Sequence, residues 1–195
     1  IIIGKGPSAR TVQLDLPPFT LVAATTRISM LSAPLRSRFS GGTFRLEFYS
    51  EDEIAEILRR SASLLNVRAG DALLASIAKR CRATPRTANY LLKRCRDLAQ
   101  LEGRDLDETI IEKTFELLEI DELGLTGPDR ALLSAIIEKF NGGPVGLNTM
   151  AAATGEEMST IEDVFEPYLI RQGLLERTPR GRVASEAAYA HLARS

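Results

Sequence analysis

The chain has 195 residues, 44% of them hydrophobic and 26% charged, which predicts a soluble globular protein of one to three small domains. A net charge of −1 argues against a generally basic nucleic-acid binder but not against a local basic patch, and a single histidine excludes histidine catalysis and histidine-rich metal sites. No apolar run approaches the ~20 residues that span a bilayer and no signal-peptide pattern is present, so we expect a cytoplasmic protein without a membrane partner.

The cysteines and the histidine are expected to have no chemical role. Cys81 and Cys95 are too few and too far apart for a zinc cluster, which predicts buried free thiols. His191 has no visible partner and is expected at the surface. The chain begins with Ile1 in a strand-like run and without a methionine, which suggests a fragment.

Strand-like patterns dominate the first 49 residues. The run Ile1–Ile3, a turn from Gly4 and the alternation over Thr11–Leu14 predict a β-hairpin. The continuous apolar run Phe19–Ala24 is typical of a parallel strand covered on both faces. Arg45–Tyr49 predicts a short final strand, after which the pattern changes to helices.

Four helices are predicted between residues 50 and 121. Ser50 and Glu53 match a capping box that starts the first helix. Asp71 is expected to cap the second helix, and Thr84, followed by Pro85, the third. The expected ranges are 51–65, 71–81, 85–102 and 108–118, with Ile54, Ile57, Leu58 and Leu64 on the buried face of the first helix.

Residues 122–195 predict a winged helix-turn-helix. A linker over 123–128 is followed by helices over 130–140, 148–153 and 160–172, then by strands over 174–177 and 182–184 and a last short helix. The helix that would enter a DNA groove is acidic: Glu156, Glu157, Glu162, Asp163 and Glu166 precede its first basic residue, Arg171. We therefore expect it not to read bases, because phosphate contacts supply most DNA affinity.

The wing carries the basic residues instead. Arg177, Arg180 and Arg182 cluster around its turn with no acid after Glu176, and Gly181 lets a backbone approach closely. These arginines are candidates for sequence-independent contact with the DNA backbone. The alternative is a winged fold used for protein contacts, with solvated charges.

Hydroxyl and guanidinium groups in two regions predict a phosphate site. Thr25 and Thr26 follow the apolar run, where ligands gather at the carboxyl end of a strand, although threonines also cap ordinary turns. Arg36 and Arg38 follow closely; an arginine supplied by a neighbouring subunit accelerates phosphoryl transfer by roughly 10³- to 10⁵-fold, whereas surface salt bridges are the alternative role.

Arg86 is a further phosphate candidate. It lies in the first turn of a predicted helix, where the dipole disfavours a cation by ~0.3–1 kcal/mol unless an anion binds there. An exposed arginine without a role is the alternative. The sequence contains no P-loop, since Gly4-Lys5-Gly6 lacks the spacing of that motif. We therefore expect that this fragment alone binds neither ATP nor Mg²⁺. No metal site is predicted.

Six stretches occur in order along the chain: LPPFTLVAATTR, PLRSRF, RLEFY, ATPRTANYLLKR, EKFNGGPVGLNTMAAATGEE and TIEDVFEPYLIRQGLLERTPRGR. Over essentially its whole length the chain resembles the RuvB family of bacterial Holliday-junction branch-migration motors. The resemblance implies the α/β remnant of an AAA+ large domain over residues 1–49, an all-α lid domain over 50–121 and a winged helix-turn-helix head over 122–195. It also implies an ATP- and Mg²⁺-dependent hexamer on the double-stranded DNA arms of a junction, beside RuvA.

Residue roles follow from the same resemblance. Thr25 and Thr26 correspond to sensor 1, Arg38 to the arginine finger that acts in trans, and Arg86 to sensor 2. Tyr49 and Arg36 would lie near the nucleotide, the hairpin ending at Leu14 would contact RuvA, and Arg177, Arg180 and Arg182 would touch DNA. The chain departs from the family at Ala83, where glycine is usual, in the irregular stretch Ser40-Gly41-Gly42-Thr43, and in lacking both Walker motifs.

Two other functions are compatible with the residues. One is another AAA+ DNA machine, of the clamp-loader or initiator type, but an initiator needs a base-reading helix and the helix here is acidic. A non-enzymatic winged-helix DNA-binding module would need neither Arg38 nor Arg86. A P-loop encoded upstream of Ile1 would distinguish the motor from the binding module.

Overall fold

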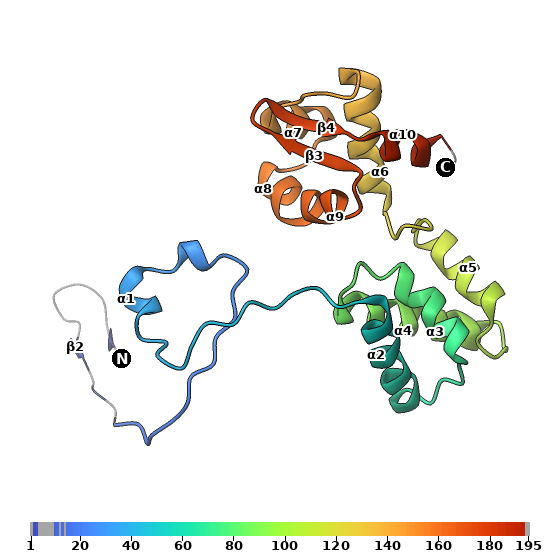
Figure 1. Ribbon diagram of the computed structural model, residues 1–195. Coiled ribbons are helices and arrows are strands. Elements are labelled where there is room, and N and C mark those ends of the chain that lie inside the picture. The colour runs from blue at the N-terminus through green and yellow to red at the C-terminus, as the bar shows by residue number, and fades with distance from the viewer. Residues whose placement is uncertain (1, 4–9, 12, 14, 194–195) are drawn as a thin grey trace. The chain divides into compact units, whose positions relative to one another are not determined.

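The computed structural model describes residues 2–3, 10–11, 13 and 15–193. The chain divides into two compact units, Ile1–Leu46 and Glu47–Ser195, which are described separately below (Figure 1).

The N-terminal unit contains a short hairpin. Strand β1 (Ile2–Ile3) pairs antiparallel with β2 (Arg10–Thr11), with Ile2 opposite Thr11. The predicted hairpin is confirmed, but its second strand includes Arg10 and does not extend to Gln13, which was predicted in it. The turn and Leu14 lie outside the described residues. Two short helices follow, η2 (Ile28–Met30) and α1 (Ala33–Arg36).

The two further strands predicted in this region are absent. Residues 19–24 and 45–49 have no regular secondary structure, and Val22 and Leu46 are 86% and 90% exposed. A strand is stable only when a neighbouring strand pairs its backbone N–H and C=O groups. In the described part of this unit the only paired strands are β1 and β2, so these apolar runs have no sheet to join.

Four helices form the first half of the C-terminal unit: α2 (Glu51–Leu64), α3 (Asp71–Lys79), α4 (Pro85–Leu101) and α5 (Glu108–Leu117). They appear in teal to yellow-green in Figure 1 and enclose one apolar core. Its fully buried members include Ile54, Leu58, Leu74, Ile77, Leu91, Leu92, Cys95, Ile110, Ile111 and Phe115.

The predicted helix starts are confirmed for α2 and α4. Ser50 Oγ accepts from the Glu53 N–H at 3.2 Å and the Ser50 N–H donates to Glu53 Oε2 at 2.8 Å, while Thr84 caps α4. The cap of α3 is Gly70, so the prediction for Asp71 was wrong. Asp71 is the first helical residue, and its carboxylate pairs with Arg59 at 2.9 Å.

The buried face of α2 also differs from its prediction. Ile54, Leu58 and Ala62 are buried, whereas Leu64 is 74% exposed. Residues four apart lie on one face of a helix, so Ala62 continues the stripe that Ile54 and Leu58 begin and Leu64 falls outside it.

We expect Ser50→Ala to lower the free energy of unfolding by about 1 kcal/mol, because both hydrogen bonds of the capping box would be lost. Urea unfolding of the chain, followed by far-UV circular dichroism, measures this change. Ser63→Ala is the matched control, since Ser63 is exposed near the other end of α2. An equal loss in both variants would contradict the capping role.

The second half of this unit is a winged helix-turn-helix. Helix α6 (Gly127–Ser134) continues as the π-helical η3 (Ala135–Lys139) and is followed by α7 (Leu147–Thr154). One continuous helical segment comprises α8 (Met158–Thr160), η4 (Ile161–Phe165) and α9 (Glu166–Arg171). Strands β3 (Leu175–Thr178) and β4 (Gly181–Ala184) and helix α10 (Glu186–Leu192) complete it around a second core (Figure 1).

The first helix here begins before its predicted start at residue 130. Thr126 and Asp129 form a capping box that opens α6 at Gly127. The predicted linker is therefore shorter than expected, and its Leu125 is buried in the second core.

The wing is held against the turn before α7. Val145 and Arg182 exchange two backbone hydrogen bonds of 2.8 Å each. Gly181 has φ +139°, and a Cβ added to it would lie 2.4 Å from the Val145 carbonyl oxygen. The close approach predicted for Gly181 is therefore to the chain's own backbone. Among the described residues, no helix has both the length and the hydrophobicity needed to cross a membrane.

Candidate functional site

The candidate phosphate-binding residues of the N-terminal unit are exposed. Thr25 Oγ1 accepts from the Arg27 N–H at 3.0 Å, and Thr26 follows it in the same turn. Arg36 ends α1 and Arg38 lies two residues beyond. Neither of these two guanidinium groups forms an ion pair within the described residues, so both are accessible to an anion on another molecule.

Arg86 occupies the second position of α4, directly after Thr84 and Pro85. Its side chain is exposed and, within the part of the chain that the structure describes, makes no ion pair. The first N–H groups of a long helix carry partial positive charge. A cation kept there without a carboxylate partner is the arrangement that favours a phosphate ligand.

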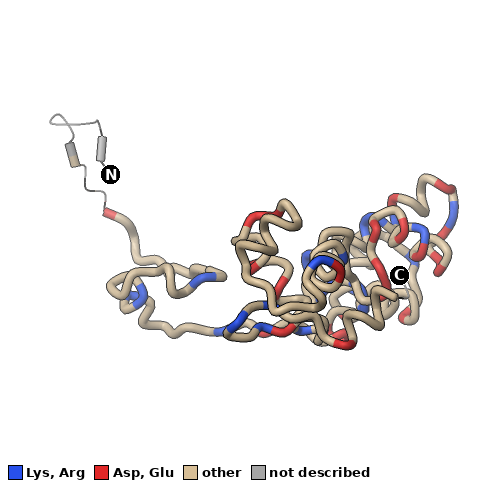
Figure 2. Tube along the Cα trace, turned by 90° about the horizontal axis from the view of Figure 1, so that it is seen from above, with Lys and Arg blue, Asp and Glu red and all other residues tan. Residues whose placement is uncertain are grey.

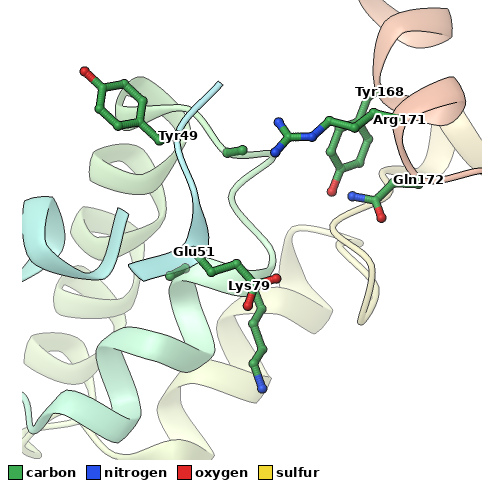
Figure 3. A pocket seen from close by; sticks show the side chains of 8 residues that line it. Tyr49, Glu51, Lys79, Tyr168, Arg171 and Gln172 are labelled. Atoms are coloured by element: carbon green, nitrogen blue, oxygen red, sulfur yellow. The ribbon is translucent and has the colours of Figure 1, made fainter. Parts of the chain in front are cut away.

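Tyr49 is 42% exposed and lines a small pocket beside the start of α2. Glu51 and Lys79 line it from one side, and Tyr168 and Arg171 of α9 from the other (Figure 3). The Tyr49 hydroxyl points away from the Tyr168 and Arg171 side chains. Residues of the four-helix half of the unit and residues of α9 therefore line the same pocket.

The three wing arginines lie in different environments. Arg182 is 7% exposed; its Nε donates to Glu166 Oε1 at 2.6 Å and its Nη2 to Glu162 Oε1 at 3.2 Å. Arg177 is more exposed and donates to Glu162 at 2.9 Å. Arg180 is exposed and has no ion-pair partner among the described residues.

The three arginines lie on the wing as predicted, but Arg182 is buried and Arg177 is ion-paired, so they do not form one exposed basic cluster. The wing itself lacks acids after Glu176, but the helical segment packed against it supplies Glu162 and Glu166. These two carboxylates are four residues apart and so lie on one helix face, opposite the cross-strand pair Arg177 and Arg182. The spacing of the two carboxylates on one helix face is visible in the sequence, but only the packing of this helix against the wing assigns arginines as their partners.

Two of the five acidic residues of this region, Glu162 and Glu166, thus have a structural role. Glu166 is 2% exposed, and its second oxygen, Oε2, lies 3.7 Å from Arg177 without a hydrogen bond. Figure 2 shows acidic and basic stretches interspersed along the trace. Arg180 is left as the wing arginine that no carboxylate neutralises within the described residues.

His191 differs from its predicted surface position. It is 7% exposed, and its Nε2 lies 2.9 Å from Asp121 Oδ2. Asp121 also accepts from the Leu123 and Leu125 N–H groups and from Arg130. His191 therefore helps to hold the segment that connects the two cores.

Both cysteines are buried free thiols, as predicted. Burial raises the pKa of Cys95 to about 11 and raises the pKa of Cys81 above its ordinary value. A thiol is nucleophilic as its thiolate, so neither residue is a nucleophile near neutral pH. Nowhere in the described residues do three His, Cys, Asp or Glu side chains gather as a metal site.

Family models match the chain in three consecutive stretches. Residues 1–46 match the Holliday junction DNA helicase RuvB P-loop domain, residues 49–121 the RuvB AAA lid domain, and residues 122–193 the RuvB C-terminal winged helix domain. The fold is therefore the end of an AAA+ large domain followed by a helical lid and a winged-helix domain.

Whole relatives agree with these matches. The Holliday junction branch migration complex subunit RuvB of Koribacter versatilis (strain Ellin345) is 56% identical over 190 residues, which are 97% of this chain and 52% of that protein. The structure of the Thermotoga maritima RuvB Holliday junction branch migration motor is 51% identical, with a TM-score of 0.83 over 90% of this chain and 59% of that chain. A mutant of the same protein gives 50% identity and a TM-score of 0.84 over 92% of this chain and 60% of that chain. The chain thus spans about half the length of the curated relative that it matches.

Proposed function

We propose, since this chain belongs to the RuvB family, that it is the sensor, lid and head portion of a hexameric ATP-driven motor that moves a Holliday junction. Residues 1–49 would complete the large ATPase domain, 50–121 form the lid and 122–195 form the head. The observation that carries the proposal is that Arg38, Arg86 and Arg180 are exposed without ion-pair partners in the described residues, while Arg177 and Arg182 are neutralised within the fold.

The residues proposed to contact ATP lie in two parts of the chain. ATP, when bound to the complete protein, supplies the phosphoryl group that water attacks. Arg86 would bind phosphate oxygens at the N-terminus of α4, and Arg38 would stabilise negative charge at a neighbour's site. Thr25 and Thr26 would hydrogen-bond at sensor 1, with Arg36 and Tyr49 nearby. Mg²⁺ would be held by other parts of the complete protein, because this chain carries neither Walker motif.

The proposed partners follow from the relatives. The Koribacter relative is named a subunit of a Holliday junction branch migration complex, which supports a Holliday junction as the substrate. From the family resemblance we extend the proposal to the double-stranded arms of the junction and to RuvA as a partner of the N-terminal hairpin. A cytoplasmic location fits a DNA motor of this family. The helix opposite the wing is acidic, and its Glu162 and Glu166 pair with wing arginines; this disfavours a base-reading initiator.

The direct test uses the complete protein that contains this chain. With ATP and RuvA it is expected to convert a synthetic Holliday junction into two duplexes, measured by native gel electrophoresis. The same protein without ATP is the control. ATP-independent DNA binding with no branch migration would overturn the motor and favour the winged-helix binding module.

Arg180→Ala is expected to weaken DNA binding equally on unrelated duplexes. Each phosphate contact that is lost should reduce the slope of log affinity against log salt by about 1. Fluorescence anisotropy at several salt concentrations measures both quantities. Arg59→Ala is the matched control, because Arg59 is an exposed arginine on α2 paired with Asp71. A loss confined to one DNA sequence would contradict contact with the DNA backbone.

A further inference from the structure

Arg82 connects the lid to the head. It lies in the turn between α3 and α4, and its Nη1 and Nη2 donate to Asp129 of α6 at 3.0 and 3.4 Å. The same guanidinium stacks 4.3 Å above the ring centroid of Tyr168 in α9. One lid residue therefore contacts two helices of the head.

Asp129 needs this arginine as its counter-ion. It is 0% exposed and accepts from the Thr126 N–H at 2.9 Å and from the Thr126 hydroxyl at 2.6 Å. Removing one partner of a buried ion pair leaves an uncompensated charge, which is strongly destabilising. Arg82 of the lid thus binds Asp129, which forms with Thr126 the capping box at the start of α6.

The backbone at this turn is held in an unfavourable conformation. Arg82 and Ala83 have φ values of +59° and +54°, in the left-handed region that residues other than glycine rarely adopt. Such conformations persist where surrounding contacts impose them. The contacts of Arg82 with Asp129 and Tyr168 are of that kind.

Helix α9 has a second connection outside the head. Arg171 stacks 4.6 Å over the ring centroid of Phe48, in the segment that precedes α2. Tyr168 and Arg171 are three residues apart and so lie on neighbouring positions of one helix face. The same two side chains line the pocket beside Tyr49 (Figure 3). Helix α9 is therefore attached both to the turn before α4 and to the segment before α2.

The geometry points to Arg82 as a positioning residue that makes the head follow the lid. Arg82 precedes Arg86 by four residues, and Thr84 caps the 17-residue helix α4 between them. Resting on the proposed function, a change at the nucleotide end of α4 would reach the wing through Arg82, Asp129 and Tyr168. The head would then move together with the lid, and the segment between them would not act as a flexible linker.

Spin-label distances between lid and head test this coupling. Ser63→Cys in α2 and Ala190→Cys in α10 place labels at exposed positions, while the buried Cys81 and Cys95 react poorly. A single narrow distance distribution is expected for the parent chain. Arg82→Gln is expected to broaden it, and an unchanged narrow distribution would overturn the inference.

Arg80→Gln is the matched control. Arg80 also pairs bidentately with a carboxylate, Glu112, at 2.9 and 2.8 Å, and stacks 4.6 Å over Phe115, but both of its partners lie within the lid. It is expected to lower stability without broadening the distances. Equal broadening of the distance distribution in both variants would indicate a general loss of stability and would contradict a specific role for Arg82.

A second variant covers the case in which Arg82→Gln fails to fold. Combining Arg82→Gln with Asp129→Asn removes the unpaired buried charge while keeping an oxygen for the capping box. This double variant is expected to fold and still show broadened distances. A narrow distribution in the folded double variant would refute the coupling.

The complete protein supplies the functional readout. Arg82→Gln is expected to retain ATP turnover but to lose most of the branch migration achieved per ATP hydrolysed. A proportional loss of turnover and migration would contradict coupling. If the unsubstituted protein showed no ATP-dependent migration, the proposed function would fail while the distance measurement still decided the link between lid and head.

Discussion

Arg38→Ala in the complete protein is expected to lower ATP turnover by roughly 10³- to 10⁵-fold with little change in nucleotide affinity, because an arginine finger stabilises charge that develops in the transition state. Arg38 is exposed and has no ion-pair partner within the described residues, so its removal should cost little stability. Steady-state phosphate release and fluorescent nucleotide binding measure the two quantities.

Hexamers assembled from two kinds of variant subunit test whether Arg38 acts on the ATP of a neighbouring subunit. Arg38→Ala subunits mixed with subunits whose P-loop is inactivated are expected to recover part of the turnover, since some interfaces would pair an intact P-loop with an intact finger. Arg60→Ala, an exposed lid substitution, serves as the control for general loss. Normal turnover of Arg38→Ala, or no recovery in mixed rings, would refute a finger acting in trans.

Arg182→Ala is expected to lower the free energy of unfolding of the head by about 3–5 kcal/mol, the usual cost of breaking a buried ion pair from one side. Its partner Glu166 is 2% exposed and would keep a charge without its hydrogen-bonded counter-ion. Urea unfolding of the chain measures the loss.

Arg180→Ala is the matched control for that measurement, because Arg180 lies on the same wing and is exposed. It is expected to change stability by no more than about 0.5 kcal/mol. Replacing Arg182 and Glu166 together by methionine should recover most of the loss, since buried pairs are often replaced by apolar residues at little cost. Similar stability of the two single alanine variants would refute the structural role of Arg182.

This contrast changes how the wing is tested for DNA binding. Substituting Arg177, Arg180 and Arg182 together would mix a folding defect with any lost phosphate contact, because Arg182 is buried. The single substitution Arg180→Ala tests the phosphate contact without the folding defect. Its exposed guanidinium has no carboxylate to replace within the described residues, so a phosphate can bind it without breaking a pair.

The sequence by itself determined the helices of the lid and head, because their signals are local. Ser50 with Glu53, and Thr84 with Pro85, satisfy helix-end N–H groups within a few residues of the chain. The apolar spacing that follows each cap indicates most of the buried face, although Leu64 of α2 is exposed and Ala62 is buried instead. The wing turn over residues 178–181 could be predicted for the same reason, since its turn-forming residues are adjacent in the chain.

Only the tertiary structure decided which charged groups are available to bind a ligand. Arg182 meets Glu166 across 16 positions, Arg82 meets Asp129 across 47, and His191 meets Asp121 across 70, so no local pattern specifies these pairs. The run over residues 19–24 shows the opposite case: its apolar pattern favours a strand, but a strand needs hydrogen-bonding neighbours that the described chain does not supply. Pairing over long separations depends on how elements pack, and composition alone does not determine it.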